Sequence, residues 1–489
     1  MLQEPIKTLS WPQMEQIFEA SLAILADVGM EIHSEKALVY MAEYGCIVDD
    51  SAMKVKIPRQ VTRKAVEKMK LAYERSDRIP ESMAVRYSHI RFRNEPHRIH
   101  EDYTVSTGGF CCYIYDLNGR RRKATENDVL CSINLVNQLD EITYTGLPVS
   151  DQDAPYLHRP VKMAGLLATY THKLGGIETF KKEDIPYLVE IGTIVKGSLA
   201  DLKREPILVG YAEVRSPLVF DRNMADIFVS YIEMGFPQTL DTMPNGGATA
   251  PMTAAGNLAM GIAETLGGLV LAYSIREDAV VGVDIIPSNC DMSSGLFRYA
   301  SADRIPLLVA RVQLISEFLG CPSGVHGGKT DSCGIGVQSG VEKAMTTMFP
   351  VLAGAVGIGT VGHLENAVTF SPEQLVIDAE VSRYVRRTLK PIEVNEETLS
   401  VDVIKRVGPG GNFLSEDSTL HMFRDELFLS DMFQVLPWES AEMQNNDTAE
   451  EKAADFANEH WKHPDPVLSD DQIKAISDVV SRAEQELTR

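Results

Sequence analysis

The amino-acid sequence predicts an α/β fold, a (β/α)8 TIM barrel with an N-terminal helical extension and a C-terminal extension. From about Tyr103 onward, short β-branched or glycine-marked runs alternate with longer helical patterns. Eight strand–helix units follow one another between residues 103 and 390, which is the number and length typical of such a barrel. A doubly wound sheet would alternate in the same way, but it gives no reason for eight units.

Residues 1–102 predict the helical extension in front of the barrel. Ser10 and Gln13 form a capping box, and an apolar series runs from there to a stop at Gly29. Ser34 and Pro58 each open a further helix. We expect this segment to have a structural role.

Within the barrel, residues 103–390, each predicted strand is short and is followed by a longer helix. The strands lie near residues 104–111, 143–149, 175–179, 207–213, 238–243, 280–286, 323–326 and 355–361. The helices lie near residues 126–139, 155–172, 183–196, 221–233, 253–274, 301–319, 338–352 and 372–387. Asp116, Asn118 and Gly119 predict a hairpin turn inside the first unit, which would stand above the barrel mouth.

The C-terminal extension, residues 391–489, follows where the alternation weakens. Its glycine-rich run GPGGNF at residues 408–413 lacks the strand–loop–helix setting of a phosphate-binding loop, so we do not expect it to bind nucleotides. Ser469 and Gln472 form a capping box that opens a last amphipathic helix, which ends near Leu487.

The charge balance limits the partners of the protein. The 489 residues include 47 Lys and Arg against 69 Asp and Glu, a formal net charge of −22. This charge repels nucleic acid and anionic membranes, and it suits a neutral, cationic or zwitterionic substrate. Residues 120–123 form the main basic cluster, for which a solvated turn and a docking contact for an acidic partner are both open readings.

Cysteine usage and hydropathy predict a cytoplasmic protein. The seven cysteines are scattered and contain no C-x-x-C pair, as expected of reduced thiols. The first residues show no export signal. The most apolar run, residues 254–274, is interrupted by Asn257 and Glu264, and we interpret it as a buried helix.

Polar side chains gather where the predicted strands end, which is where barrels of this class bind their substrates. The loop at residues 322–343 is the densest example. The candidate site residues are Phe110, Glu178, Glu213, Asp241, Asn245, Gly246, Gly247, Asp284, His326, Lys329, Gln338, His363 and Glu365. Four consecutive strands carry an acidic residue at their ends, and such a mouth attracts a cation. Tyr144 and Tyr211 lie near strand ends and would add cation–π contacts.

Each of these residues also has a plainer interpretation. Any single carboxylate among them serves equally well to hold loop amides. A zinc site built from His326, Cys333 and His363 is conceivable, but no tight ligand pair such as C-x-x-C or H-E-x-x-H supports it, so we predict no metal. Without a G-x-S-x-G elbow, nucleophilic hydrolysis is disfavoured.

Seven segments, in order along nearly the whole chain, resemble the trimethylamine methyltransferase (MttB-like) family of corrinoid-dependent methyltransferases. They are LPVS at 147–150, SPL at 216–218, GGATAP at 246–251, SCGIGVQSGVEK at 332–343, LAGA at 352–355, TFSPEQLVID at 369–378 and VGPGGNFL at 407–414. The resemblance implies a (β/α)8 barrel that accepts a corrinoid protein at its mouth. It implies no directly bound cofactor, because the corrinoid is carried by the partner protein.

One position separates the chain from the founding members of that family. They carry pyrrolysine on the loop before the segment around Gln338, and an ungapped count places ordinary Lys329 there. The chain therefore resembles the non-pyrrolysine branch, whose members demethylate glycine betaine, proline betaine, carnitine and γ-butyrobetaine. A quaternary ammonium leaves as a neutral amine, so the enzyme has only to orient the N-methyl group and exclude water.

The resemblance implies methyl transfer from a quaternary amine to the Co(I) corrinoid of a partner protein, in anaerobic one-carbon metabolism. Lys329, His326 and Glu213 are the expected catalytic residues, and the other ten candidates are expected to bind substrate. Two alternatives stay open: a methylamine or methoxylated substrate, and a betaine-binding subunit without catalysis. We also expect a homo-oligomer.

Overall fold

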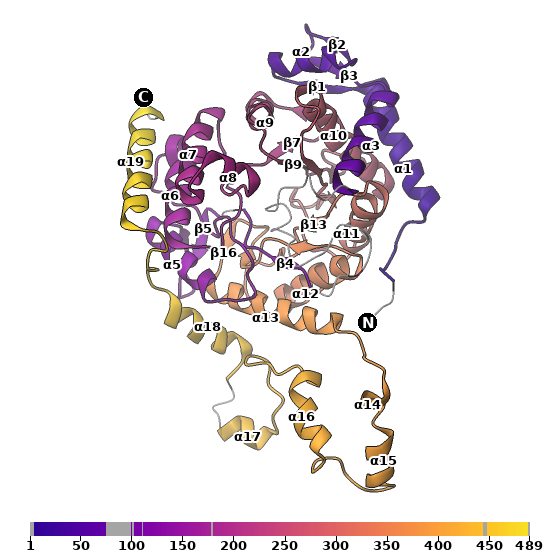
Figure 1. Ribbon diagram of the computed structural model, residues 1–489, viewed down its shortest axis with the longest axis vertical. Helices are drawn as coiled ribbons and strands as arrows, with labels where there is room; N and C mark the ends of the chain where they lie inside the picture. Colours follow the sequence, from indigo (N-terminus) through magenta and orange to yellow (C-terminus); the bar gives the residue numbers. More distant parts are fainter. Residues whose placement is uncertain are drawn as a thin grey trace.

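A computed structural model describes residues 4–74, 99, 102–109, 111–177, 179–443 and 447–487, which adopt a mixed α/β fold (Figure 1). Short parallel strands lie inside a layer of helices. The strands are β4 (Thr104–Val105), β7 (Ala212–Val214), β9 (Gln238–Thr242), β11 (Val281–Val283), β13 (Gly324–Val325) and β14 (Gly357–Ile358). The main helices are α5 (Glu126–Asn137), α6 (Arg159–Tyr170), α7 (Ile185–Lys196), α9 (Arg222–Met234), α10 (Ala254–Ile275), α11 (Arg304–Val312), α12 (Val337–Leu352) and α13 (Pro372–Leu389).

The helices coincide with the predicted ones to within a few residues, because their end signals are local. Thr125 and Asp128 form the capping box of α5, and the Asp221 side chain accepts a hydrogen bond from the Met224 amide at the start of α9. Ser371 caps α13, where Pro372 occupies the first turn. Short additional helices lie between the main ones: α8 (Leu199–Arg204) and the 3-10 or π turns Tyr156–His158, Lys182–Asp184 and Gln313–Phe318.

The strands pair in the order expected for a barrel, but the described residues do not form a closed one. Two three-stranded parallel sheets form, β11–β9–β7 and β13–β14–β4. Isolated parallel bridges join Ser106 to Tyr144 and Thr145 to Leu174, which continues the second sheet. Between β11 and β13, no ladder is present in the part of the chain that the structure describes. The prediction of a closed hydrogen-bonded barrel is therefore not confirmed.

Arg311 lies in the seam between β11 and β13. The carbonyl groups of Ser323 and Val325 accept hydrogen bonds on the β14 side, so the Gly324 carbonyl points toward β11. There it accepts a hydrogen bond from Arg311 Nη2 at 2.6 Å instead of from a strand amide. The same guanidinium holds both carboxylate oxygens of Asp284, which follows β11. A buried side chain thus bridges the seam that a strand ladder would otherwise close.

Helix α10 is apolar because it is buried. Among the described residues it alone is long and apolar enough to cross a membrane, yet most of it lies inside the protein. Its one carboxylate, Glu264, accepts hydrogen bonds from Ser216 Oγ, Thr242 Oγ1 and the Leu218 amide. These donors compensate for the loss of water around the carboxylate, so the helix is a core element, as predicted.

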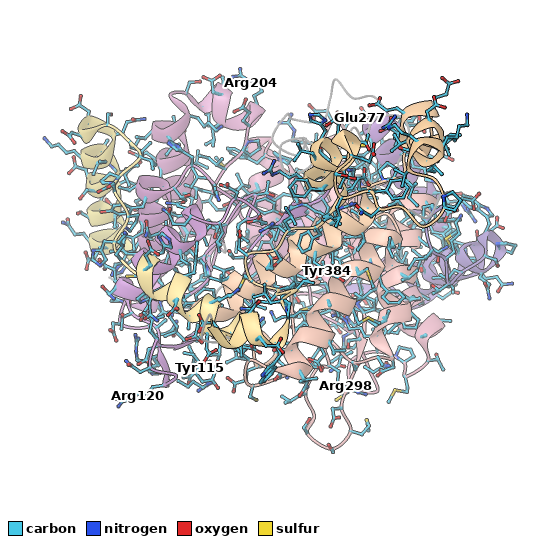
Figure 2. The ribbon with its side chains drawn as sticks, turned by 90° about the horizontal axis from the view of Figure 1, so that it is seen from below. Tyr115, Arg120, Arg204, Glu277, Arg298 and Tyr384 are labelled. Atoms are coloured by element: carbon cyan, nitrogen blue, oxygen red, sulfur yellow. The ribbon has the colours of Figure 1, made fainter. Side chains whose placement is uncertain are left out.

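The predicted hairpin is present, and it lies beside the loop that follows the eighth predicted strand, residues 355–361. β5 (Tyr113–Tyr115) pairs antiparallel with β6 (Arg121–Lys123) around a turn held by Asp116. β5 also pairs with β16 (Thr369–Phe370), which returns along β15 (His363–Leu364). Tyr115 and Arg120 lie together at one edge of the molecule (Figure 2).

Both chain ends pack against the central region. The N-terminal segment contains α1 (Trp11–Ala23), a π-helical turn (Ile24–Val28), β1 (Met30–Ile32), α2 (Glu35–Glu43), β2 (Ile47–Asp49), β3 (Lys54–Lys56) and α3 (Arg59–Glu74). Its sheet takes in β8 (Val219–Phe220) from the central region, and α1 and α3 pack on α10. The C-terminal segment contains α14 (Glu396–Leu399), α15 (Val401–Val407), α16 (Asp417–Glu426), α17 (Trp438–Met443), α18 (Ala449–His460) and α19 (Asp470–Leu487). α18 packs on α13, and α19 on α6 and α7.

Candidate active site

A cavity of about 380 Å³ lies where the strands end. Its lining comes from both three-stranded sheets and from the loops that follow their strands. The lining residues are Ser106, Gly108, Gly109, Tyr144, Gly146, Gly176, Tyr211, Glu213, Thr239, Asp241, Met243, Asp284, Ile286, Gly324, Val325, His326, Lys329, Gly357, Ile358, Gly359, Thr360, His363 and Ala367. The structure therefore brings together six predicted site residues: Glu213, Asp241, Asp284, His326, Lys329 and His363.

Lys329 reaches the cavity on the loop after β13, and its side chain is only 7% exposed. Its Nζ lies 3.8 Å from the centroid of the Tyr299 ring. The Arg304 guanidinium lies 5.6 Å from the centroid of that ring. Burial, together with the positive charge of Arg304, lowers the pKa of Lys329 to about 7. The amine is therefore balanced between its charged and neutral forms near neutral pH.

Two histidines border the same cavity. His326 follows β13 and His363 lies on β15. Burial, strengthened by the charge of Lys329, lowers the pKa of both imidazoles well below its usual value, so both are neutral near pH 7. Among the described residues, neither ring nitrogen of His363 has a hydrogen-bond partner, and the same holds for Nδ1 of His326. These ring nitrogens are buried polar atoms with unsatisfied hydrogen-bonding capacity beside the cavity.

A buried ion pair positions the loops that carry Lys329 and His363. Lys343 Nζ lies 2.6 Å from Asp378 Oδ2 and donates to the Gly328 carbonyl, also at 2.6 Å. Asp378 in turn accepts a hydrogen bond from the Gly362 amide at 2.6 Å. Gly328 directly precedes Lys329, and Gly362 directly precedes His363. One salt bridge between α12 and α13 thus fixes the backbone beside two cavity residues.

The loop after β15 has an unusual backbone. Glu365, Asn366 and Ala367 have φ values of 52°, 54° and 67°, three consecutive residues in the left-handed region. The Glu365 carboxylate accepts a hydrogen bond from Arg121 Nε at 2.7 Å, and its amide donates to the Ser332 carbonyl at 2.8 Å. These contacts hold a strained turn whose third residue lines the cavity.

Several predicted site residues lie elsewhere. Asn245 and Gly246 form β10 (Asn245–Gly246), which pairs with β12 (Ser288–Asn289), and neither they nor Gly247 line the cavity. Gln338 is exposed at the start of α12, where its side chain donates to Glu342. Glu365 holds the hairpin through Arg121 and does not line the cavity.

Three further predicted site residues need separate comment: two lie outside the described residues, and one lines the cavity but is already held by an arginine. Phe110 and Glu178 lie outside the described residues. Asp284 lines the cavity, but Arg311 engages both of its carboxylate oxygens, at 2.7 and 2.5 Å. Within the described ranges, no group of three or more His, Cys, Asp or Glu side chains is arranged to hold a metal ion.

The sequence interpretation missed the buried cations around the cavity. Arg304 and Arg311 lower the pKa of Lys329, and Arg311 pairs with Asp284. The Tyr299 ring faces the Lys329 amine, and none of these three residues directly follows a strand. Arg304 and Arg311 are fully buried on α11, although long charged side chains are seldom buried without a partner. An arginine within the apolar stretch LLVARV was the available signal.

Comparison with known proteins identifies the family that the chain matches. Residues 2–488 match the family described as Trimethylamine methyltransferase (MTTB). The chain is 28% identical over 486 residues to the trimethylamine methyltransferase MttB of Methanosarcina barkeri (strain Fusaro / DSM 804), covering 97% of this chain and 94% of that protein. It is also 28% identical over 449 residues to the glycine betaine methyltransferase of Desulfitobacterium hafniense (strain Y51), covering 90% of both.

Among solved structures, the Methanosarcina barkeri monomethylamine methyltransferase MtmB aligns with a TM-score of 0.47 and 10% identity, covering 98% of this chain and 88% of that one. The two curated relatives named above act on different amines but are equally identical to this chain. Overall sequence identity therefore does not indicate which of the two amines this chain uses, and the residues of the cavity have to be considered for that question.

Proposed function

Because the chain belongs to the trimethylamine methyltransferase (MTTB) family, we propose that it moves a methyl group from a carboxylated quaternary amine to the Co(I) corrinoid of a partner protein. Membership makes it a methyltransferase of this family. The substrate we propose is of the glycine betaine, proline betaine, carnitine or γ-butyrobetaine type. One observation carries the proposal: the cavity has a basic and imidazole side and an acidic and aromatic side.

The basic and imidazole side comes from the β13–β14–β4 sheet and its loops. It carries Lys329, His326 and His363, and the unsatisfied ring nitrogens of the two histidines lie beside the cavity. A substrate carboxylate would accept hydrogen bonds from the Lys329 ammonium and from an imidazole N–H. Charge-assisted bonds of this kind are about twice as strong as neutral ones.

The acidic and aromatic side comes chiefly from the β11–β9–β7 sheet. Glu213, Asp241 and Tyr211 line the cavity there, and Tyr144 adds ring surface from beside β4 of the other sheet. A trimethylammonium group has no N–H to donate, so carboxylate charge and aromatic faces are the groups that stabilise it. A zwitterion whose two ends need different partners matches these two sides of the cavity.

The transfer step needs no proton. The carbon–nitrogen bond breaks, nitrogen keeps that electron pair and leaves as a neutral tertiary amine, and the Co(I) acceptor supplies the pair for the new bond to carbon. The protein has to orient one N-methyl group toward the acceptor and exclude water. Seven of the lining residues are glycine, which leaves room where side chains would otherwise fill the cavity.

We extend the proposal to the architecture and the setting. The pairing order of the strands supports a (β/α)8 barrel, residues 103–390, whose ladder is not closed among the described residues, with extensions at residues 1–102 and 391–489. The free cysteines and the buried position of α10 support action in the cytoplasm.

A substrate panel tests the proposed reaction. Purified protein is mixed with a Co(I) corrinoid protein and, separately, with each betaine, with trimethylamine and with a methoxylated compound, and the Co(I) absorption is followed. We expect Co(I) to be consumed with at least one carboxylated quaternary amine and not with the other two. Consumption with trimethylamine alone, or thermal stabilisation by a betaine without turnover, would contradict the proposal.

A further inference from the structure

The segment between α13 and α18 projects from the body of the molecule as an arm, which we define as residues 391–440 (Figure 1). It does not contribute to the cavity. None of its residues is buried, and α14, α15 and α16 contain no buried side chain. The arm therefore has no hydrophobic core of its own, although it contains regular helices.

The arm exposes an unusual amount of apolar surface. Fourteen of its large apolar side chains are exposed: Ile392, Val394, Leu399, Val401, Ile404, Phe413, Leu414, Leu420, Leu427, Leu429, Phe433, Val435, Leu436 and Trp438. Spread over the whole arm, they present on the order of 1,000 Å² of apolar area, which is comparable with the roughly 800 Å² per partner that a stable interface buries. Monomeric soluble proteins rarely expose apolar patches larger than a few hundred Å².

The base of the arm is fixed to the body. Arg383 donates to the Leu429 carbonyl at 2.9 Å, and Lys452 donates to the Asp431 carbonyl at 2.9 Å. The ring of Tyr384, labelled in Figure 2, packs edge-on against Phe428 at 5.4 Å. The arm therefore has a defined position, so its apolar surface is presented in a fixed direction.

The arm starts at the end of α13 that lies far from the cavity. Arg386, near that end, bonds to Asp102 and to the Tyr103 carbonyl, which come just before β4, whereas the cavity lining begins at Ser106, after β4. At about 1.5 Å per residue, 18-residue α13 separates its two ends by roughly 27 Å. A methyl acceptor at the cavity therefore has no need to touch the arm.

We propose that a second copy of this chain covers the arm, with the arms of the two copies exchanging apolar faces about a two-fold axis. A second copy carries the same apolar surface at the same concentration, and isologous pairing is the commonest form of homo-oligomer. The arm has ten Asp and Glu against three Lys and Arg, and the whole chain has a net charge of −22. Two such chains repel, so apolar contact has to drive their association.

A triple variant tests the inference in the full-length chain. Ile392→Glu, Leu414→Glu and Val435→Glu change side chains that are 82%, 87% and 98% exposed, so each chain should still fold. By sedimentation equilibrium the wild type should have twice the 54.0 kDa chain mass, and added salt should strengthen the dimer. The dissociation constant of the triple variant should rise at least about a hundredfold. Ile47→Glu, at a 66% exposed site on β2, is the matched control and should remain dimeric.

Cross-linking of the wild type gives a second result that does not depend on any variant folding. Unlabelled and ¹⁵N-labelled chains are mixed and treated with an amine-reactive cross-linker, and Lys405 on α15 should form links between the two isotopes. A monomeric wild type at about 10 µM would overturn the inference. A dimer unchanged by the triple substitution, or an arm needed only for binding the corrinoid protein, would do so as well.

Discussion

Two buried lysines on one continuous segment show how a neighbouring carboxylate determines whether a buried amine keeps its charge. Lys329 follows β13 and Lys343 lies on α12, and they are 7% and 1% exposed. Burial lowers the pKa of both, but beside Lys343 the Asp378 carboxylate opposes the shift at 2.6 Å. Lys329 faces the Tyr299 ring and lies near Arg304, and its pKa reaches about 7. Lys343 is thus a structural cation, and Lys329 is a group that titrates in the cavity.

Removing the structural cation should have the largest effect. In Lys343→Met, Asp378 stays buried without its partner, which should lower the free energy of unfolding by about 3–5 kcal/mol in urea titrations. Adding Asp378→Asn should restore part of that loss, because the unpaired charge disappears. Lys474→Met, at an exposed site on α19, is the control and should change stability by less than about 0.5 kcal/mol. Equal losses in the single and double variants would show that the ion pair does not matter.

Removing the titrating amine should affect binding and spare the fold. In Lys329→Met, the KM for a carboxylated quaternary amine should rise roughly 10- to 100-fold, because a charge-assisted hydrogen bond is lost, while the protein stays folded. Tetramethylammonium, which lacks a carboxylate, is the control substrate, and its KM should not change. An equal rise for both substrates would contradict the carboxylate contact.

The same amine should make binding depend on pH. As pH rises through about 7, Lys329 loses its charge, so affinity for a carboxylated amine should fall by up to about tenfold per pH unit. Lys329→Met should remove this dependence. Arg304 and Arg311 lower the pKa of Lys329 further, and Cys111 and Glu213 oppose them. The neutral imidazoles of His326 and His363 line the same cavity.

Stability should respond to pH in the opposite direction. The folded-state pKa of Lys329 lies below the unfolded value, so between pH 7 and 10 the unfolded chain binds more protons. The contribution of Lys329 to stability is therefore full above its unfolded pKa and is lost as pH falls toward 7. The difference in unfolding free energy between the wild type and Lys329→Met should rise with pH, at no more than about 1.4 kcal/mol per unit. A difference that stays constant would mean that Lys329 titrates normally.

Local sequence signals predicted the helices and six of the eight strands, but not the contacts that connect them. Where strands were predicted near residues 143–149 and 175–179, the described residues form only isolated bridges at Tyr144, Thr145, Val149 and Leu174. The capping boxes and the placement of His326 and Lys329 follow from residues a few positions apart. The ion pair of Lys343 with Asp378 joins residues 35 positions apart, and no pattern along the chain predicts it. Arg311 spans the seam between β11 and β13 by the same kind of distant contact, and the predicted closed barrel is not confirmed among the described residues.

Asn245 and its neighbours show the limit of locating a site from strand ends alone. The prediction placed residues 245–247 in the cavity because they follow β9. In the structure, the chain turns there to pair β10 with β12, and the Asn257 side chain donates to the Pro244 and Ser288 carbonyl groups. The residues therefore hold two loops together. Whether a residue after a strand faces the cavity depends on this tertiary pairing.

The smallest expected effect tests whether the hairpin also positions Lys329. Arg121 bonds to Glu365, whose amide donates to the Ser332 carbonyl on the Lys329 loop. The two side chains are about one-third exposed, so Arg121→Gln should change stability by no more than about 1 kcal/mol. It should raise the KM by about threefold, roughly 0.7 kcal/mol, because the strained turn at Glu365 relaxes and the loop loosens.

The exposed neighbour Arg120→Gln provides the control for that variant, since it removes a charge from the same hairpin without touching Glu365. If both variants raise the KM equally, the effect comes from hairpin charge and not from the loop. If Arg121→Gln leaves the KM unchanged, the Lys343–Asp378 pair alone suffices to hold the Lys329 loop. Either outcome would show how many contacts are needed to position the Lys329 amine in the cavity, whereas Lys343 is positioned by its ion pair with Asp378.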